Sequence, residues 1–171
     1  MGDRSVTRNC GPDLVRVGAG LPVAAYRDEI TTALHGGRAV IVAPPGTGKT
    51  TFVPPLVASR CSGRVIVTQP RRVAARAAAR RLATLTGTRP GEFASHTVHG
   101  ESTTTRDTKV EFVTTGVLLR RLLSDPDLTG VDAVVLDEVH ERHLDADLVV
   151  AMVCEVAQLR DDLTIVAMSA T

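Results

Sequence analysis

The 171-residue chain has the length of a single domain, and its 43% content of hydrophobic residues argues against disorder. Its only aromatic residues are Tyr26, Phe52, Phe93 and Phe112, which predicts a core of Val, Leu, Ile and Ala and excludes a surface of aromatic rings that stack on bases. The net charge of +1 does not by itself imply a polyanionic partner.

The elements predicted along the chain alternate between strands and helices after an irregular beginning. Residues 1–20 mix Gly, Arg, Asp and Pro without periodicity, which predicts a lead-in to a domain over residues 21–171. Apolar, β-branched runs predict strands at 38–43, 64–69, 109–114, 131–136 and 163–168. Helical spacing and composition predict helices at 49–60, 73–85, 116–123 and 146–159.

This alternation is typical of βαβ units. It predicts an α/β fold of three layers, in which helices flank a mostly parallel central sheet. Ligands of such sheets bind at the carboxyl ends of the strands. The loop after Ala43 and the acidic pair after Leu136 both follow predicted strands, so both are expected at that edge.

The charges are unevenly distributed along the chain. No Asp or Glu occurs between Glu29 and Glu92, whereas acidic residues outnumber basic ones from Glu92 onward. A solvated helix face explains some of the basic residues but not an acid-free segment of this length. We therefore expect the first half to face anions. The basic residues of that segment are Arg38, Lys49, Arg60, Arg64, Arg71, Arg72, Arg76, Arg80, Arg81 and Arg89.

The cysteines and the absence of targeting segments indicate the compartment. Cys10, Cys61 and Cys154 are widely spaced and form no C-x-x-C pair, which favours reduced thiols. The N-terminus lacks the apolar segment of a signal peptide, and no apolar run is long enough to span a membrane. The sequence predicts a cytoplasmic protein without a membrane partner.

A glycine-rich loop lies between the first predicted strand and the helix that follows it. It reads Ala-Pro-Pro-Gly-Thr-Gly-Lys-Thr over residues 43–50, with Ala43 where the general phosphate-binding loop has Gly. Gly46 and Gly48 allow successive N–H groups to turn toward one anion, and the helix N-terminus adds its dipole. Lys49 would reach the β- and γ-phosphates of ATP, and the Thr50 hydroxyl would ligate Mg²⁺. The alternative is a Gly/Pro turn with an exposed lysine.

An acidic pair follows the buried strand predicted at 131–136. A carboxylate at that position can hold the Mg²⁺ that bridges the phosphates, which is the role expected of Asp137. Glu138 beside it can orient and deprotonate the attacking water. An Asp-Glu pair at a strand end can also serve only as a helix cap.

The histidines allow a second interpretation of this region. Residues 140–143 read His-Glu-Arg-His, which partly matches the helix signature of zinc metalloproteases, but the histidines are three residues apart rather than four. His96 and His99 form a similar pair, so four imidazoles could make a zinc site. Local hydrogen bonding is the competing explanation.

Two adjacent arginines follow the strand predicted at 64–69. The segment Thr68-Gln69-Pro70-Arg71-Arg72 is expected at the same sheet edge, one strand over from the phosphate-binding loop. Arginines at a strand end suit the phosphate oxygens of a polynucleotide. A solvated helix start is the alternative.

These segments together resemble a known family. Residues 43–50, 69–72, 114–116, 137–140 and 169–171 stand in the order of motifs I, Ia, Ib, II and III of superfamily 2 helicases. His140 and the Pro-Arg-Arg step resemble the DEAH-box branch. Residues 159–163 and 168–171 resemble the bacterial HrpA/HrpB group of ATP-dependent RNA helicases. The resemblance covers residues 21–171 and implies a RecA-like P-loop NTPase domain.

The resemblance implies a role for each matching residue. Lys49, Asp137 and Glu138 would serve catalysis, with Thr50 and Asp137 on the metal. His140, Ser169 and Thr171 would couple hydrolysis to strand movement. The residues that would hold the triphosphate are Pro45, Gly46, Thr47, Gly48, Lys49, Thr50 and Thr51. Those that would contact the backbone of single-stranded nucleic acid, with RNA favoured, are Arg71, Arg72 and Thr114.

The sequence departs from the family pattern in three ways. Val139 replaces the usual Ala, a small apolar change, and Thr115 replaces an acidic residue common at that step. Helicases of this type also have a second RecA-like domain, whose arginines complete the ATP site, and the sequence ends after Thr171. An arginine finger contributes orders of magnitude in rate, so we expect this chain alone to hydrolyse ATP poorly and not to unwind nucleic acid.

The sequence therefore predicts the ATP-binding and hydrolysing first domain of a DEAH-box RNA helicase. Its cofactors would be ATP and Mg²⁺, and its partners single-stranded nucleic acid and a second RecA-like domain. A nucleotide-binding interaction module without motor activity is one alternative. A domain of a DNA-translocating superfamily 2 ATPase is another.

Overall fold

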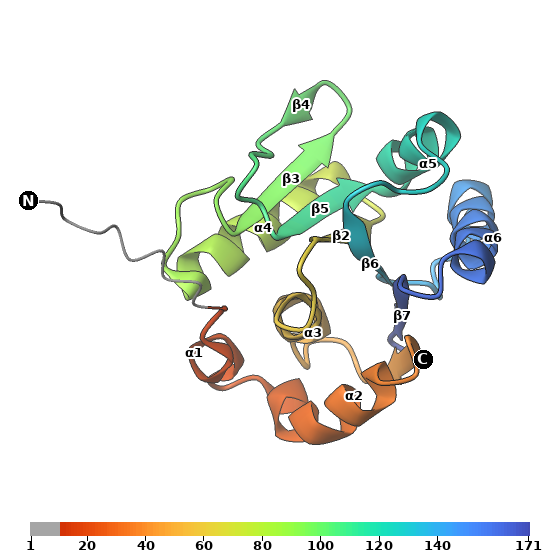
Figure 1. The fold of residues 1–171 in the computed structure, drawn as a ribbon. Helices are drawn as coiled ribbons and strands as arrows, with labels where there is room; N and C mark the ends of the chain where they lie inside the picture. The colour runs from red at the N-terminus through yellow and green to blue at the C-terminus, as the bar shows by residue number, and fades with distance from the viewer. Residues whose placement is uncertain (1–10) are drawn as a thin grey trace, which may run out of the picture.

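The computed structural model describes residues 11–171, which fold around one seven-stranded sheet of order β1-β7-β6-β2-β5-β3-β4 (Figure 1). All its strand pairs are parallel except β3–β4, which confirms the predicted α/β fold with a mostly parallel sheet. The strands are β1 (Arg38–Val42), β2 (Arg64–Gln69), β3 (Ala94–Val98), β4 (Glu101–Ser102), β5 (Val110–Thr114), β6 (Val131–Leu136) and β7 (Thr164–Ser169).

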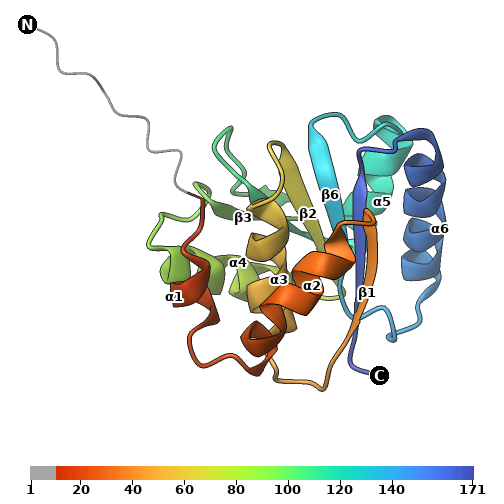
Figure 2. The same ribbon diagram turned by 60° about the horizontal axis from the view of Figure 1, so that its bottom comes forward.

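Helices cover both faces of the sheet and complete the three layers (Figures 1 and 2). On one face α2 packs against β1, α3 against β2, and α4 against β3 and β5, while α1 packs on α3 and α4. On the other face α5 packs against β2 and β5, and α6 against β7. The helices are α1 (Leu14–Gly18), the 3₁₀ helix η1 (Pro22–Tyr26), α2 (Arg27–Leu34), α3 (Lys49–Ala58), α4 (Arg72–Thr86), α5 (Thr115–Ser124) and α6 (Leu144–Leu159).

The strand β6 shows why its sequence forms a central strand. Its side chains alternate between two buried clusters: Ala133 and Val135 join the cluster under α1–α4, and Val134 and Leu136 join the cluster under α5 and α6. A strand that is buried on both faces must be apolar on both faces, and a continuous Val/Leu run satisfies this requirement. Burying apolar area at about 25 cal/mol per Å² supplies the main stabilisation of such a core.

The predicted irregular lead-in is wrong for Leu14–Gly18, which form α1. The Asp13 carboxylate caps this helix by accepting two backbone N–H hydrogen bonds of the first turn, each of 3.1 Å. Val17 is 1% exposed and belongs to the core cluster under α1–α4. A single capped turn is too short to show helical periodicity, which explains the error. Residues 1–10, with Cys10, lie outside the described part of the chain.

The predicted position of the Thr68–Arg72 segment is also wrong in one respect. The strands β7 and β6 lie between β1 and β2, so the segment is not one strand over from the phosphate-binding loop. Chain order does not set spatial order in this sheet, because crossovers insert later strands between earlier ones. The strands β3 and β4 are additional to the sequence prediction.

The carboxyl ends of the parallel strands gather the predicted motifs at one edge of the sheet. The phosphate-binding loop follows β1, Pro70 follows β2, Thr115 follows β5, Asp137 follows β6 and Ser169 ends β7. Within residues 11–171, no helix combines the length and apolar character needed to cross a membrane.

Candidate nucleotide and nucleic-acid site

The loop between β1 and α3 has the backbone conformation that its glycines allow. Gly46 and Gly48 adopt φ angles of 79° and 92°, in the left-handed region that disfavours side chains. A Cβ on Gly48 would also lie 2.9 Å from the side chain of Leu21. The Val23 N–H donates to the Thr47 carbonyl oxygen at 3.0 Å, so η1 is hydrogen-bonded to the loop. The glycines and this hydrogen bond thus define the conformation of the loop.

Lys49 is buried at the start of α3, with 6% of its surface exposed. Its ammonium donates to the carbonyl oxygens of Ala43 and, at 3.1 Å, Pro44. Both acceptors belong to the loop, so the ammonium lies next to the backbone that would surround a phosphate. An ammonium held by neutral carbonyls can exchange them for anionic oxygens, which form stronger hydrogen bonds.

The Asp137 carboxylate is the meeting point of three segments. Its Oδ2 accepts a hydrogen bond of 2.6 Å from Thr50 Oγ1 and another of 2.6 Å from Gln69 Nε2. Its Oδ1 accepts the Glu138 N–H at 2.9 Å, and its own N–H donates to Thr68 Oγ1 at 3.1 Å. Burial raises the pKa of the Asp137 carboxyl above its ordinary value, and the hydrogen bonds from Thr50 and Gln69 lower it. The carboxylate is therefore fixed in orientation.

The donor set at Thr50 and Asp137 fits a small hard cation. Mg²⁺ prefers oxygen ligands in octahedral geometry, with one or two protein carboxylates and the rest from phosphates and water. Adjacent ligands of such an ion lie roughly 2.9 Å apart, close to the 2.6 Å between Thr50 Oγ1 and Asp137 Oδ2. Within residues 11–171, no three His, Cys, Asp or Glu side chains are grouped to hold a metal by themselves.

Glu138 and His140 form the next contact along the sheet edge. Glu138 adopts a φ of 54°, uncommon for a residue with a side chain. His140 Nε2 lies 3.2 Å from Glu138 Oε2, while His140 Nδ1 accepts the Ala170 N–H at 3.3 Å. Because Nδ1 accepts a hydrogen bond, a neutral ring would carry its hydrogen on Nε2, the nitrogen that faces Glu138. His140 thus joins the acidic motif to the end of β7.

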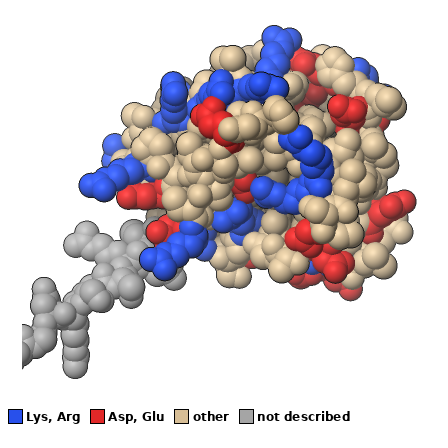
Figure 3. All heavy atoms as spheres, turned by 90° about the horizontal axis from the view of Figure 1, so that it is seen from above, with Lys and Arg blue, Asp and Glu red and all other residues tan. Residues whose placement is uncertain are grey.

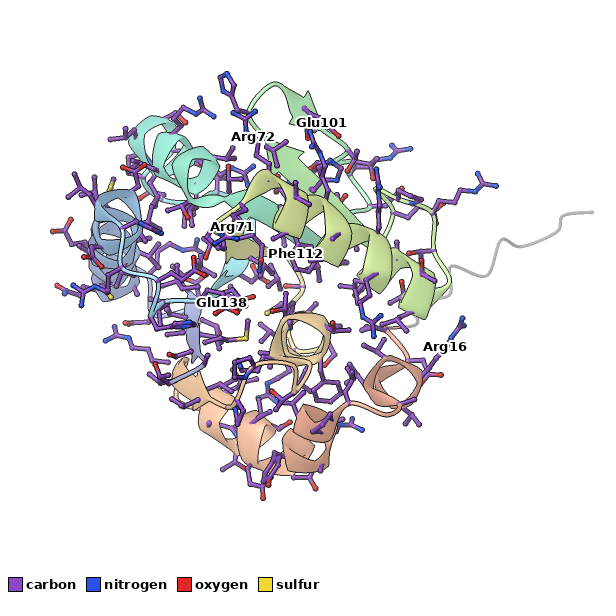
Figure 4. All side chains as sticks on the ribbon, turned by 180° about the vertical axis from the view of Figure 1, so that it is seen from behind. Arg16, Arg71, Arg72, Glu101, Phe112 and Glu138 are labelled. Atoms are coloured by element: carbon purple, nitrogen blue, oxygen red, sulfur yellow. The ribbon has the colours of Figure 1, made fainter. Side chains whose placement is uncertain are left out.

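A cavity of about 320 Å³ opens beside this edge between α4, α5 and the β3–β4 hairpin. Arg120 Nη1 lies 3.2 Å from His99 Nδ1 across it. Arg71 is not among its lining residues, and in Figure 4 it lies between Arg72 and Glu138. The residues that line the cavity are Pro70, Arg72, His99, Thr114, Gly116 and Arg120.

Comparison with known proteins decides the family. The DEAD/DEAH box helicase family matches residues 26–171. The chain belongs to this family. It is similar to the ATP-dependent RNA helicase HrpB of Escherichia coli, with 44% identity over 155 residues that make up 88% of this chain and 19% of that protein. It is also similar to the ATP-dependent RNA helicase HrpA of Borreliella burgdorferi, with 36% identity over 155 residues, 88% of this chain and 19% of that protein.

A solved structure agrees with the sequence relatives of this DEAD/DEAH box chain. A crystal structure of the Escherichia coli DEAH/RHA helicase HrpB matches it with a TM-score of 0.84 and 43% identity, covering 89% of this chain and 20% of that chain. The chain therefore spans about a fifth of the length of the relatives it matches. The match confirms the resemblance to DEAH-box helicases and the fold. Because both sequence relatives are named as ATP-dependent, nucleotide use is a property of the family.

The structure brings most of the sequence-predicted site residues of this helicase domain into two groups. Thr50, Asp137, Glu138 and His140 are joined by consecutive contacts, and Lys49 precedes Thr50 at the start of α3. Ser169 Oγ is 3.5 Å from His140 Nδ1, a distance too long for a strong hydrogen bond, and it donates to the Thr171 carbonyl oxygen at 2.5 Å. The second group contains Arg72 and Thr114.

The four histidines of the alternative zinc site have other partners. His96 Nε2 lies 2.8 Å from Glu101 Oε1, His99 contacts Arg120, and His140 contacts Glu138. His143 Nε2 lies 4.0 Å from Glu141 Oε2. These contacts are the local hydrogen bonds and ion pairs that compete with metal ligation.

Sequence reasoning missed three residues of the site. Gln69 contacts the Asp137 carboxylate, and His99 and Arg120 line the cavity beside Arg72. Gln69 stands within a recognised motif and at the end of a strand, which is a usable signal. His99 stands out in the sequence only as a candidate zinc ligand, and Arg120 carries no signal. The two side chains meet in the fold, where Arg120 Nη1 lies 3.2 Å from His99 Nδ1.

Proposed function

We propose that residues 21–171 are the ATP-binding and hydrolysing first RecA-like domain of a DEAH-box RNA helicase. The observation that carries this proposal is the 2.6 Å contact between Thr50 Oγ1 and Asp137 Oδ2, two residues 87 positions apart in the sequence. It joins the hydroxyl of a phosphate-binding loop to the carboxylate of an acidic motif, the pair that a nucleoside triphosphate with Mg²⁺ requires.

The loop and Lys49 would hold the triphosphate. Backbone N–H groups of residues 46–50 would donate to the phosphate oxygens at the N-terminus of α3. The Lys49 ammonium would move from the carbonyls of Ala43 and Pro44 to the β- and γ-phosphates. Thr50 and Asp137 would hold Mg²⁺, whose charge would neutralise the phosphate oxygens. The Thr50 hydroxyl can ligate the ion through its oxygen while it donates its hydrogen to Asp137.

Glu138 would accept the proton of the attacking water. His140 Nε2 lies 3.2 Å from Glu138 Oε2, so the other carboxylate oxygen, Oε1, would accept the proton of the water. The contact of His140 with the Ala170 N–H supports a coupling role for His140, Ser169 and Thr171, because a change at Glu138 would reach the end of β7 through one side chain.

The second group of residues would bind the backbone of a single strand. Arg71, Arg72 and Thr114, with Arg120 and His99, supply cationic and hydroxyl donors for phosphate oxygens. Figure 3 supports a division of charge over the surface, with many Lys and Arg on one part of the face and Asp and Glu clustered toward the side where α6 lies in Figure 1. Such contacts do not read base edges, so binding would tolerate any sequence. The names of both relatives support RNA as the polynucleotide.

The test is ATP hydrolysis by the chain, measured with enzyme in excess because arginines of a second RecA-like domain would supply much of the rate in a longer protein. Single-stranded RNA should stimulate hydrolysis more than single-stranded DNA. Glu138→Gln should keep ATP affinity within about twofold and lower hydrolysis roughly 100-fold or more, because it removes the general base. Glu155→Gln on α6, an exposed position outside the site, is the matched control.

Three results would redirect the proposal. ATP binding without hydrolysis under any condition would favour a nucleotide-binding interaction module. Stimulation by DNA alone would favour a DNA-translocating ATPase. Unchanged hydrolysis by Glu138→Gln would contradict the role of this residue.

A further inference from the structure

Gln69 is a buried amide at the junction of the two groups of site residues. It is the last residue of β2, with 5% of its surface exposed, and it pairs in register with Thr114 of β5. Its Nε2 donates to Asp137 Oδ2 at 2.6 Å. The chain leaves it directly into Pro70 and Arg72, which line the cavity proposed for nucleic acid. The side chain of Gln69 therefore contacts the Asp137 carboxylate, while the residues that follow it in the chain line the cavity proposed for nucleic acid.

We propose that Gln69 is a positioning residue that couples nucleic-acid binding at Pro70–Arg72 to the orientation of the Asp137 carboxylate. The proposal rests on the proposed function, because it assumes that nucleotide with Mg²⁺ and nucleic acid bind at the two places described above. It adds a residue and a linkage that the motif roles do not contain.

The contacts around Asp137 show what Gln69 can control. Thr50 and Gln69 donate to the same Oδ2. Thr50 belongs to the phosphate-binding loop, and Gln69 ends the strand that leads into the cavity proposed for nucleic acid. A displacement of Gln69 alters one of the two hydrogen bonds that fix this oxygen, and hydrogen bonds weaken steeply with distance and angle. The carboxylate that serves the metal is thus held from both sites at once.

The connection from Gln69 to the arginines is short and stiff. Proline at position 70 restricts its own φ angle, and it also restricts the backbone of the residue before it. Arg71 is extended, with φ −128° and ψ 141°, and α4 begins at Arg72. A displacement of Arg72 on binding a phosphate is therefore expected to displace Gln69 as well, because the backbone between them has few accessible conformations. Linkage requires the reverse as well: nucleotide binding at Asp137 must change nucleic-acid affinity by the same factor.

A purely structural role for Gln69 makes a different prediction. In that case the amide only satisfies a buried acceptor, so its loss would lower the thermal stability and leave the linkage between the two ligands unchanged. The two roles are separated by measuring the linkage itself.

The experiment uses Gln69→Met, which keeps the length of the side chain but removes the donor, and Gln69→Glu, which keeps the shape but places a second carboxylate against Asp137. Gln158→Met on α6, outside the site, is the matched control. Fluorescence anisotropy gives the affinity for a labelled single-stranded RNA with and without a non-hydrolysable ATP analogue and Mg²⁺. Titration calorimetry gives the affinity for the analogue with Mg²⁺.

The wild type and Gln158→Met should show RNA affinities that change several-fold when the analogue and Mg²⁺ are added. Gln69→Met should bind RNA alone with an affinity within about twofold of the wild type. The ratio of its RNA affinities with and without the analogue should be about one. Its affinity for the analogue with Mg²⁺ should fall roughly tenfold, the loss expected for one hydrogen bond to a charged group. Gln69→Glu should show the same loss of linkage and a larger loss of affinity for the analogue.

Retention of the wild-type linkage by both Gln69 variants would overturn the proposal, as would a wild type that binds both ligands without linkage. A wild type that binds neither ligand is a different result, because it contradicts the proposed function itself. Circular dichroism melting of each variant identifies any that fails to fold, and the other Gln69 variant then gives the answer.

Discussion

At the scale of one residue, the role proposed for Asp137 as a metal ligand opposes the stability of the fold. Burial raises its pKa, so the folded state favours the protonated carboxyl. A raised pKa in the folded state means that this contribution to stability is present at low pH and is lost as pH rises through the folded-state pKa. At neutral pH the ionised carboxylate is therefore held at a cost, which hydrogen bonds from Thr50 and Gln69 reduce. Such a cost is expected where a cation completes the site.

The two described cysteines should differ in reactivity. Burial, assisted by the negative charge of Asp132, raises the pKa of the Cys61 thiol to about 11, whereas Cys154 on α6 is exposed. The thiolate is the reactive species, so Cys61 should remain unmodified at pH 7 in the folded protein. Peptide mapping after brief treatment with iodoacetamide should find Cys154 labelled and Cys61 unlabelled, with both labelled in denaturant. Labelling of Cys61 before Cys154 would contradict this assignment.

At the scale of elements, a buried ion pair fixes β5 to its neighbours. Glu111 is 0% exposed and receives two hydrogen bonds from Arg121 of α5, at 2.9 and 2.8 Å. It also contacts Arg64 of β2 at 3.3 Å and accepts from Thr97 of β3 at 2.7 Å. Strands β2, β3 and β5 and helix α5 thus meet at one carboxylate, near the start of β5 and away from the carboxyl end of that strand.

Glu111→Gln should destabilise the fold by about 2–4 kcal/mol, because it leaves Arg121 without its charged partner. Burial raises the pKa of Glu111, but Arg121, Thr97 and Arg64 together lower it by more, so the pKa is below its ordinary value. The contribution of Glu111 to stability is therefore present above the ordinary Glu value of about 4.3 and is lost as pH falls through the lower folded-state value. Urea unfolding at several pH values should show the gap between wild type and Glu111→Gln narrowing below about pH 4. The role would be excluded if Glu111→Gln lowered the free energy of unfolding at pH 7 no more than the exposed control Glu155→Gln does.

The success of sequence reasoning differs between elements for physical reasons. The run at 131–136 predicted β6 because a strand buried on both faces leaves an unbroken apolar signature. The strand β3 escaped prediction because Ser95, His96 and Thr97 carry polar side chains that the fold satisfies through Glu101, Thr104 and Glu111. Local propensity does not report such long-range partners. The spatial order of β1, β7, β6 and β2 likewise depends on crossovers rather than on local sequence.

At the scale of the whole molecule, the parallel sheet brings motifs that are far apart in the sequence to one edge. Each motif follows a different strand, so residues far apart in the chain share contacts of about hydrogen-bond length, such as Thr50 with Asp137. The motifs predicted that edge, because their types and order are characteristic. The contact of Gln69 with Asp137 and the cavity at Arg72 required the packed structure.

Titration calorimetry of three proteins tests whether the loop at residues 43–50 binds ATP with Mg²⁺. The wild type should bind one equivalent of ATP in the presence of Mg²⁺. Lys49→Ala should weaken this binding at least roughly 100-fold, because it removes a charge-assisted contact to two phosphates. Lys109→Ala removes the only other lysine, whose ammonium contacts the Ser62 carbonyl at 2.5 Å away from the loop, and should bind like the wild type. Wild-type affinity in Lys49→Ala would contradict the account.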